Sequence, residues 1–338
     1  MVSEHASARS VIQLRVVNIS PRWRAIDDFA IWKRVIGGSI QFIRDFAHVL
    51  VQLCLRPHVV HLTTSGQFAV ARDLLVMKAA RLFKVPVIYH IRFGRVPQLA
   101  KANSREWRLI SRAMRLAHTV IAIDGYTEQA IRDSLPEVRV VRIPNCVDIS
   151  SLPKPSTPSS EEQTVMFLGW VIPTKGVEEL IQAWASLRPD GWQLQVVGPG
   201  NTDYQHALMD KYQPTGLEFL GEKNHSEAML LLADADVFVL PSYTEGFPNV
   251  VVESMALGKP IVATRVGAIP EMLSDGCGFL IEARDVDGLK SALTKLMADA
   301  ELRQSIGARA QERAINDFSL DAVFERYMAL WREAAGLD

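Results

Sequence analysis

Short runs of β-branched and other apolar residues alternate along the chain with longer stretches in which apolar residues recur every three or four positions. The short runs have the length and composition of β-strands, and the longer stretches have the period of amphipathic helices. Regular alternation of the two is typical of parallel sheets whose strands are joined by helices. The pattern therefore predicts an α/β protein.

The predicted strands form two groups. The first contains VIQLRVVNI, VVHLTT, VPVIYHI, TVIAID and VRVVRIP, at residues 11–19, 59–64, 85–91, 119–124 and 138–144. The second contains TVMFLG, LQVVG, LEFLG, DVFVLPS, PIVAT and GFLIE, at residues 164–169, 194–198, 217–221, 236–242, 260–264 and 278–282. Because 338 residues also exceed what one core ordinarily supports, we predict two doubly wound, Rossmann-like domains at residues 1–150 and 164–319.

Two segments lie outside these domains. Residues 151–163 are rich in proline and serine and are predicted to form a linker. Residues 320–338 are predicted to contain a helix, since their apolar positions share one helical face. Those positions are Val323, Phe324, Tyr327, Leu330 and Trp331.

Composition is that of a globular protein, with 48% hydrophobic and 22% charged residues, but the charge is unevenly distributed. Residues 1–150 contain 22 Lys and Arg against 11 Asp and Glu, whereas residues 151–338 contain 15 against 27. The two halves could attract each other. Alternatively, the basic half could dock an anionic partner such as a phosphorylated acceptor or a membrane surface.

Cysteine usage and hydropathy favour a cytoplasmic protein. Cys54, Cys146 and Cys277 form no C-x-x-C pair, which argues against a disulfide framework or a zinc site. No apolar run approaches the roughly 18 residues of a membrane-spanning helix, and the first ten residues lack the apolar core of a signal peptide. We therefore expect any membrane contact to be peripheral.

The loops that follow the strands of the second domain are the candidate ligand site, because open parallel sheets bind ligands beyond the carboxyl ends of their strands. These loops read GWVIPTKG, GPGN, GEKN, YTEGFPN and TRVGAIPE. A single glycine in such a loop is ordinary, but all five are rich in glycine, polar groups or charge, as close approach to a ligand requires. Together they predict a pocket for a polar, phosphorylated ligand.

Two glutamates flank the most informative of these loops, EGFPNVVVE at residues 245–253. Pro248 suits the start of a helix, and Asn249 is predicted to cap it. Exposed amides and the positive end of the helix dipole at such a start hold phosphate. We therefore expect Glu245 on one side of the charged part of the ligand and Glu253, about one turn into the helix, on the other.

The stretch PSYTEGFPNVVVESMALGKPIVATRVGAIPEML, residues 241–273, closely resembles the signature of glycosyltransferase family four. Members of this family are retaining, nucleotide-sugar-dependent enzymes of the GT-B fold. Four further stretches agree, namely RPHVVHLTTS, IPNCVD, FLGWVIPTKGVEELI and LQVVGPG, at residues 56–65, 143–148, 167–181 and 194–200. The resemblance implies two Rossmann-like domains facing across a cleft, with the donor held mainly by the second domain, the acceptor mainly by the first, and the last helix bracing the first.

The resemblance also implies roles for individual residues. The catalytic candidates are Glu245 at the donor sugar hydroxyls, Lys175 at the diphosphate and His90 beside the reacting sugar. Glu253 would bind the ribose hydroxyls. The remaining donor-binding candidates are Gly169, Gly198, Gly246, Phe247, Pro248, Asn249 and Val250.

The implied reaction moves a hexose-type sugar from a UDP- or GDP-sugar to a glycan or lipid-linked acceptor in cell-envelope or exopolysaccharide synthesis. Fixed cations and amides stabilise the negative charge that develops on the departing diphosphate, so Lys175 is the electrostatic catalyst and Glu245 a positioning residue. Neither a metal nor another cofactor is expected. The alternatives are a nucleotide-sugar epimerase or hydrolase of the same fold and a non-catalytic nucleotide-sugar-binding partner protein.

The sequence departs from the family pattern at several positions. Trp170 stands where an arginine usually pairs with the lysine, a loss for which Arg265 is the candidate substitute, and Cys146 and Ala268 replace usual glycines. The first strand, VIQLRVVNIS, is followed by PRWRAIDDF in place of a glycine-rich loop, for which Gly37 and Gly38 are a weak substitute. These departures motivate the non-catalytic alternative.

A basic stripe in the first domain is a candidate anion or acceptor site. Arg105, Arg108, Arg112 and Arg115 are spaced three, four and three residues apart and share one helical face. Together with Arg92, Arg95 and Lys101, and separately Arg265, they could bind anionic lipid headgroups or a lipid-diphosphate acceptor. A solvated helix face is the alternative. Nucleic acid is not expected, since no stacking aromatics are interleaved with these charges.

Two further motifs are interpreted as structural. Asp234 and Asp236 form a D-x-D that precedes its strand, at the edge away from the predicted pocket, so we expect a turn and not a metal site. His58 and His61 flank a strand start without a further residue at metal-ligand spacing, and are expected to be structural.

Overall fold

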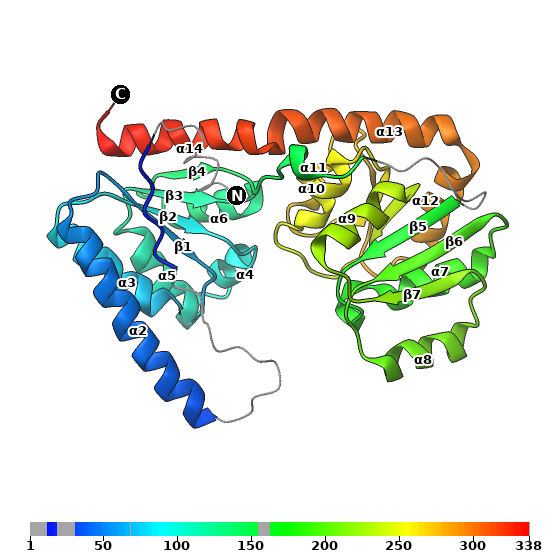
Figure 1. Ribbon diagram of the computed structural model, residues 1–338, viewed down its shortest axis with the longest axis horizontal. Helices are drawn as coiled ribbons and strands as arrows, with labels where there is room; N and C mark the ends of the chain where they lie inside the picture. Colours follow the sequence, from blue (N-terminus) through cyan, green and yellow to red (C-terminus); the bar gives the residue numbers. More distant parts are fainter. Residues whose placement is uncertain (1–11, 19–30, 68, 155–162, 338) are drawn as a thin grey trace. The chain divides into compact units, whose positions relative to one another are not determined.

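The structure is a computed structural model that describes residues 12–18, 31–67, 69–154 and 163–337, with only the backbone over 31–42 (Figure 1). It contains two compact units. Unit 1 comprises Met1–Ile143 and Phe324–Asp338, and unit 2 comprises Pro144–Val323. Each unit is built from a parallel sheet and helices, which confirms the predicted α/β class with two Rossmann-like domains.

Unit 1 contains a four-stranded parallel sheet in the order β1-β2-β3-β4. The strands are β1 (Val60–Thr64), β2 (Val87–Ile91), β3 (Thr119–Ala122) and β4 (Val140–Arg142). Each falls within a stretch that the sequence predicted. The helices are α2 (Ile31–Cys54), α3 (Ala69–Leu82), α4 (Val96–Lys101), α5 (Arg105–Met114) and α6 (Gly125–Ser134).

The two faces of this sheet bury different side chains, because successive residues of a strand point to opposite faces. On one face, Tyr89 and Ile91 of β2 share a core with Met77 of α3 and Ile110 of α5. On the other face, His90 contacts the part of α14 (Leu320–Ala335) that belongs to unit 1. The five apolar residues predicted to share a face of this last helix are all buried.

Unit 2 contains a six-stranded parallel sheet in the order β10-β9-β8-β5-β6-β7. In chain order the strands are β5 (Gln163–Leu168), β6 (Trp192–Val197), β7 (Leu217–Gly221), β8 (Val237–Leu240), β9 (Ile261–Thr264) and β10 (Phe279–Ile281). The helices are α7 (Val177–Leu187), α8 (Thr202–Tyr212), α9 (His225–Asp234), α10 (Asn249–Ala256), α11 (Ile269–Met272), α12 (Val286–Ala298) and α13 (Ala300–Arg313). Contacts join α7 to α8 and α12, and α10 to α9, α11 and α13.

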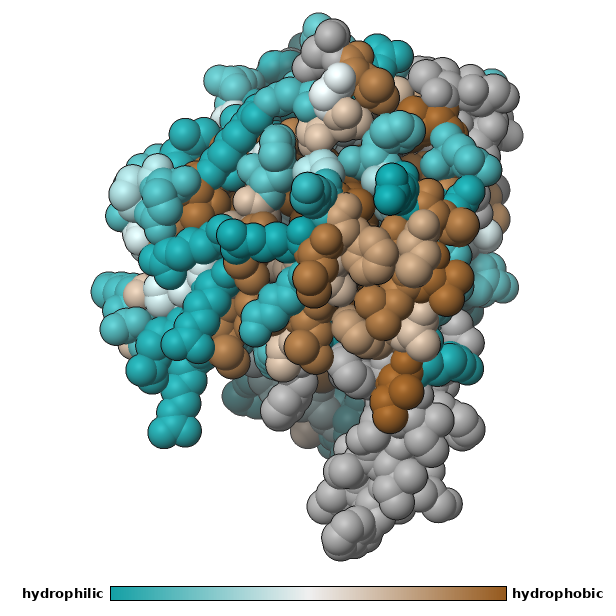
Figure 2. Space-filling model, turned by 90° about the vertical axis from the view of Figure 1, so that its left-hand side faces the viewer, coloured by the Kyte–Doolittle hydropathy of each residue, from teal (hydrophilic) through white to brown (hydrophobic). Residues whose placement is uncertain are grey.

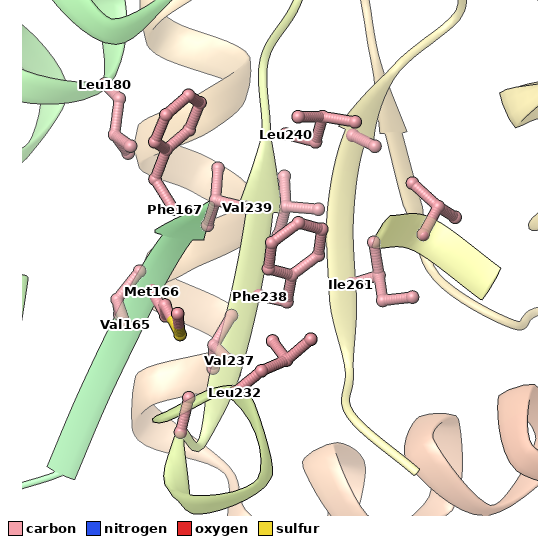
Figure 3. Close-up of a cluster of buried hydrophobic side chains, with 14 of the residues drawn as sticks. Val165, Met166, Phe167, Leu180, Leu232, Val237, Phe238, Val239, Leu240 and Ile261 are labelled. Carbon is pink, nitrogen blue, oxygen red and sulfur yellow. The ribbon is translucent and has the colours of Figure 1, made fainter. Parts of the chain in front are cut away.

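The central strands of unit 2 are buried on both sides (Figure 3). Val165, Met166 and Phe167 of β5 lie beside the continuous apolar run Val237–Leu240 of β8, and Ile261 of β9 follows. Strands that are covered by helices on both faces are apolar throughout instead of alternating. This core holds the carboxyl ends of the strands, and the loops after them, in place.

Four expectations for the chain outside the sheets have different outcomes. The strand predicted at residues 11–19 is wrong where it is described, since residues 12–18 are not paired in a sheet and Val16 is 68% exposed. An apolar run forms a strand only when a neighbour accepts its hydrogen bonds. Gly37 and Gly38 lie within α2. The predicted PRWRAIDDF loop, and residues 155–162 of the predicted linker, lie outside the described residues.

Candidate functional site

The loops at the carboxyl ends of the unit 2 strands touch one another through glycine. Gly198, which follows β6, has a φ of 138°, and a Cβ atom there would lie 1.9 Å from the carbonyl oxygen of Gly169, which follows β5. A side chain at this position is therefore both strained and excluded by backbone. The two glycines allow the β5 and β6 loops to approach closely.

The YTEGFPN loop after β8 is held from both sides. The amide of Tyr243 donates to the carbonyl oxygen of Thr174 at 2.9 Å, and that of Ala268 donates to Gly246 at 2.8 Å. Gly267 has no room for a Cβ, which would lie 2.4 Å from the carbonyl oxygen of Glu245. Backbone contacts thus fix three of the five predicted loops against each other, at one edge of the sheet.

Lys175 and Glu245, two of the three catalytic candidates, form an ion pair at this edge. Lys175 ends a short 3-10 helix, Pro173–Lys175, and its Nζ lies 2.5 Å from Oε1 of Glu245. Their side chains are only 24% and 12% exposed. Because partly buried charges lose hydration, each side chain holds the other in place and compensates its charge. The arrangement presents a cation and a carboxylate together beside α10.

Helix α10 begins immediately after this pair, but its cap differs from the prediction. Pro248 occupies the N-cap position with a φ of −73° and no side-chain cap hydrogen bond, and Asn249 is the first helical residue. The prediction that Asn249 caps the helix is therefore wrong. Its Oδ1 instead accepts a hydrogen bond from Nδ2 of Asn145 at 2.9 Å. Without a capping side chain, the first-turn amides and the positive end of the dipole are the anion-binding feature of this helix.

Phe247 contributes packing to the same loop. Its ring meets that of Phe318 edge to face, with 6.0 Å between centroids. The backbone of Val147, in the IPNCVD stretch, is hydrogen-bonded on either side of Ser319, to Phe318 and to Leu320. The side chain of Phe247 therefore packs the loop against this segment. Its predicted role in donor binding then falls to its backbone.

Glu253 lies in the second turn of α10 in a mostly buried position. Burial raises the pKa of its carboxyl above the ordinary value, and the charge of nearby His225, 3.9 Å away, opposes the shift. A carboxylate that has lost part of its hydration is stabilised by hydroxyl donors. This property suits the ribose-binding role expected of Glu253.

The positions where the sequence departs from the family pattern differ in exposure, since Ala268 is buried, Cys146 is half-buried and Trp170 lies at the surface. Trp170 is 54% exposed. Arg265, the suggested substitute for the missing arginine, has its Nε 3.4 Å from Glu282, and both side chains are at least half exposed. Asp236 of the D-x-D accepts a hydrogen bond from the amide of Thr164 at 2.8 Å, where β5 and β8 lie side by side. This contact agrees with the structural interpretation of Asp236.

The third catalytic candidate, His90, lies in unit 1 and is 1% exposed. Its Nδ1 is 3.2 Å from Nε2 of His61, and Nδ1 of His61 is 3.0 Å from Nε1 of Trp331. Burial, followed by the charge of Arg92, lowers the pKa of His61 to about 4. Burial, followed by His61, lowers that of His90 well below its usual value. Both imidazoles are therefore neutral at neutral pH.

Sequence reasoning assigned His61 a structural role and Trp331 only an apolar one. Their contact joins residues 270 positions apart, so no local sequence pattern predicts it. The available signal was strand alternation, which places His61 and His90 on the same face of the sheet when their strands are neighbours.

The basic stripe of α5 lies on the surface of unit 1. Arg105, Arg108, Arg112 and the C-cap residue Arg115 are exposed, as the spacing predicts. Members of the wider basic set have carboxylate partners, among them Arg95, which pairs with Glu106 at 3.1 Å, and Arg115, which pairs with Glu137 at 2.7 Å.

Both units match known glycosyltransferase families. Residues 148–313 match the model described as "Glycosyl transferases group 1", and residues 12–151 match "Glycosyltransferase Family 4". Two α/β units, each with one of these matches, have the GT-B fold. The chain belongs to the family-four type of these proteins, as the resemblance predicted.

Individual proteins agree with this placement. The chain is 29% identical over 206 residues, 54% of each chain, to a GDP-mannose-dependent monoacylated alpha-(1-6)-phosphatidylinositol monomannoside mannosyltransferase of Corynebacterium glutamicum. The chain spans about half the length of the curated relatives it matches.

Solved structures share the fold. Sucrose-phosphate synthase of Thermosynechococcus elongatus superposes with a TM-score of 0.75 and 19% identity, covering 90% of this chain and 80% of that one. Anabaena HepE, solved in complex with UDP, gives 0.71 and 21%, with 84% and 82% covered. Among the described residues, no helix is long and apolar enough to cross a bilayer.

Proposed function

We propose that this protein transfers a sugar, with retention of configuration, from a nucleotide-sugar donor to a hydroxyl of a glycan or lipid-linked acceptor. The observation that carries the proposal is the Lys175–Glu245 ion pair directly before the uncapped start of α10, with Glu253 in the second turn of the same helix. A cation, a helix N-terminus and two carboxylates on either side are the groups that a nucleoside diphosphate sugar requires.

In the proposed complex, the first-turn amides of α10 and the Lys175 ammonium hold the diphosphate. Cleavage of the bond from sugar to phosphate leaves negative charge on the diphosphate, and donors already aimed at it stabilise that charge without reorganisation. Glu245 turns from Lys175 to the sugar hydroxyls, and Glu253 accepts from the ribose. Since Lys175 and the amides supply the positive charge, we propose that the reaction needs no metal ion.

The donor we propose is a UDP- or GDP-sugar. Support comes from two relatives, because HepE was solved with UDP and the corynebacterial relative is described as GDP-mannose-dependent. The lipid-linked class of acceptor is supported by the phosphatidylinositol monomannoside in the name of the latter. Cell-envelope or exopolysaccharide synthesis is the setting proposed for the reaction.

We also place the protein in the cytoplasm, at the membrane surface, with unit 1 facing the lipid. Large apolar side chains of α2 and α3 are exposed, among them Val51, Leu75 and Leu82, and the two helices pack together. Figure 2, which views the side of Figure 1 where α2 and α3 lie, shows apolar side chains gathered beside hydrophilic ones. Helix α3 also contacts α5, and a surface that combines exposed apolar side chains with the arginines of α5 suits insertion among anionic headgroups.

A turnover assay tests the proposed function. The full chain is incubated with a panel of UDP- and GDP-sugars, with glycan and lipid-linked acceptors, in the presence and absence of EDTA. We expect acceptor-dependent transfer that EDTA does not abolish and a product whose anomeric configuration, read by proton NMR, matches the donor. Donor consumption without an acceptor would indicate an epimerase or hydrolase instead, and binding without turnover would indicate a partner protein.

A further inference from the structure

Three side chains of unit 1 form a continuous hydrogen-bonded chain. Trp331 of α14 is 3.0 Å from His61 of β1, measured from Nε1 to Nδ1, and His61 is 3.2 Å from His90 of β2, measured from Nε2 to Nδ1. The rings of Tyr327 and Trp331 pack against His61, with centroid distances of 5.5 and 5.8 Å. All the residues involved lie within unit 1, so its own fold sets the geometry.

The chemistry of the three groups fixes the direction of every bond. An indole N–H only donates, so Nδ1 of His61 must be the acceptor. A neutral imidazole that accepts at Nδ1 carries its hydrogen on Nε2, and this hydrogen points to Nδ1 of His90. That atom must then be an acceptor as well, which leaves the hydrogen of His90 on Nε2. Burial of both histidines keeps them neutral, as their lowered pKa values indicate.

The far end of this chain is unpartnered. Nε2 of His90 is buried, and no described group of the protein forms a hydrogen bond with it. Buried N–H groups are nearly always paired, because an unpaired one loses hydration without compensation. A donor that is fixed in direction and left unpaired by its own fold is suited to an oxygen of a bound ligand.

We propose that Trp331 and His61 are positioning residues that hold His90 in its Nε2–H tautomer, so that His90 donates a hydrogen bond to an oxygen of the transferred sugar. This inference rests on the proposed function and adds to it two residues that act through His90. The opposite tautomer would present a lone pair and repel a sugar oxygen that has no hydrogen to donate. The Trp331 indole thus determines whether His90, two hydrogen bonds along the chain of side chains, donates or accepts at Nε2.

The test combines the tautomeric state with catalysis. Long-range proton–nitrogen NMR spectra distinguish Nε2–H from Nδ1–H imidazole in protein labelled at histidine. For the wild type we expect both His61 and His90 as Nε2–H tautomers. The variant Trp331→Phe keeps an apolar ring and removes the indole N–H. We expect it to show mixed tautomers and a kcat lower by about tenfold, with little change in KM. This loss of kcat is smaller than the loss caused by removing a transition-state hydrogen-bond donor itself.

Trp184→Phe is the matched control. Trp184 is fully buried in unit 2, and its Nε1 donates to the carbonyl oxygen of Thr215 at 2.8 Å, so this variant also loses one buried indole hydrogen bond. We expect wild-type tautomers and kcat from it.

Three results would overturn the inference. The first is an Nδ1–H tautomer of His90 in the wild-type spectrum, a measurement that does not depend on any variant folding. The others are unchanged tautomers in Trp331→Phe and an equal loss of kcat in both variants. An inactive wild type with the expected tautomers would instead count against the proposed function and, with it, the assigned contact to the sugar.

Discussion

At the scale of single residues, the candidate site depends on charges that the fold has partly removed from water. Lys175 and Glu245 compensate each other, whereas Glu253 has no comparable cation among the described residues, since His225 lies 3.9 Å away and is itself exposed. A nucleotide-sugar donor, which brings a diphosphate and hydroxyl groups, supplies partners for all three side chains. The anion competes for Lys175, and the hydroxyls donate to the two carboxylates.

The raised pKa of Glu253 predicts a pH-dependent stability. The folded protein retains this proton at pH values where the unfolded chain, with a pKa near 4.5, has lost it, so stability falls as pH rises through this interval. The variant Glu253→Gln lacks the titration. We expect the stability of the wild type relative to Glu253→Gln to decline as pH rises from about 4.5, measured by urea unfolding. A relative gain over that interval would contradict the assignment.

Residue types and spacing predicted the loops of the candidate site but not the contacts between its side chains. Glu245 and Glu253 were selected because they flank the loop after β8 and the start of the next helix, at an edge where open parallel sheets bind ligands, whereas Lys175 was selected through the resemblance to the family. The Lys175–Glu245 pairing joins residues 70 apart, and the His61–Trp331 contact joins residues 270 apart. Only the packed fold brings these partners together.

At the scale of elements, glycine determines how closely the loops approach. Runs of valine and isoleucine located ten of the strands, because a strand covered by helices on both faces must be apolar. The same signal failed at residues 11–19, where the described part lacks a sheet neighbour. The preference of asparagine for helix caps also failed at α10, since Asn249 bonds to Asn145 instead of its own helix. The local preference thus lost to the lack of a sheet neighbour at the first place and to a tertiary contact at the second.

The contact between the β5 and β6 loops predicts a large effect of Gly198→Ala. Its methyl group would meet the carbonyl of Gly169 at a φ that other residues rarely adopt, and we expect destabilisation of about 3 kcal/mol or more. Gly191→Ala is the control, because Gly191 also has a positive φ, of 71°, but nothing lies within 4 Å of the added atom. It should cost about 1 kcal/mol.

Chemical denaturation of both variants measures the difference. Equal losses would mean that backbone strain alone matters and that the two loops do not need to touch.

At the scale of the whole molecule, the uneven charge divides between the two units. The excess of basic residues belongs to the first 150 residues, and four of them form the exposed stripe on and beside α5. The acidic residues of unit 2 include both site glutamates. The sequence predicted this division, but it could not show that large apolar side chains of α2 and α3 are exposed in the same unit, because exposure depends on how helices pack.

The proposed membrane face predicts salt-sensitive binding to anionic vesicles. We expect the full chain to float with vesicles that contain phosphatidylglycerol and not with phosphatidylcholine alone, since each basic residue near such a surface contributes about 1 kcal/mol. Arg108→Glu with Arg112→Glu should abolish flotation. The matched change Arg188→Glu with Lys211→Glu, on the surface of unit 2, should not. Flotation that ignores lipid charge would contradict the proposal.

The most direct test of the whole account is calorimetric titration of UDP and GDP into the wild type, Lys175→Ala and Lys211→Ala. Lys211 forms an exposed ion pair with Glu178 at 2.8 Å in the same unit and serves as the control. We predict that one of the two nucleotides binds the wild type at one site. Lys175→Ala should weaken the affinity by about tenfold or more, as the loss of a charged hydrogen bond does. Lys211→Ala should leave the affinity unchanged. Binding of neither nucleotide, or equal affinity in all three proteins, would contradict a diphosphate site at the start of α10.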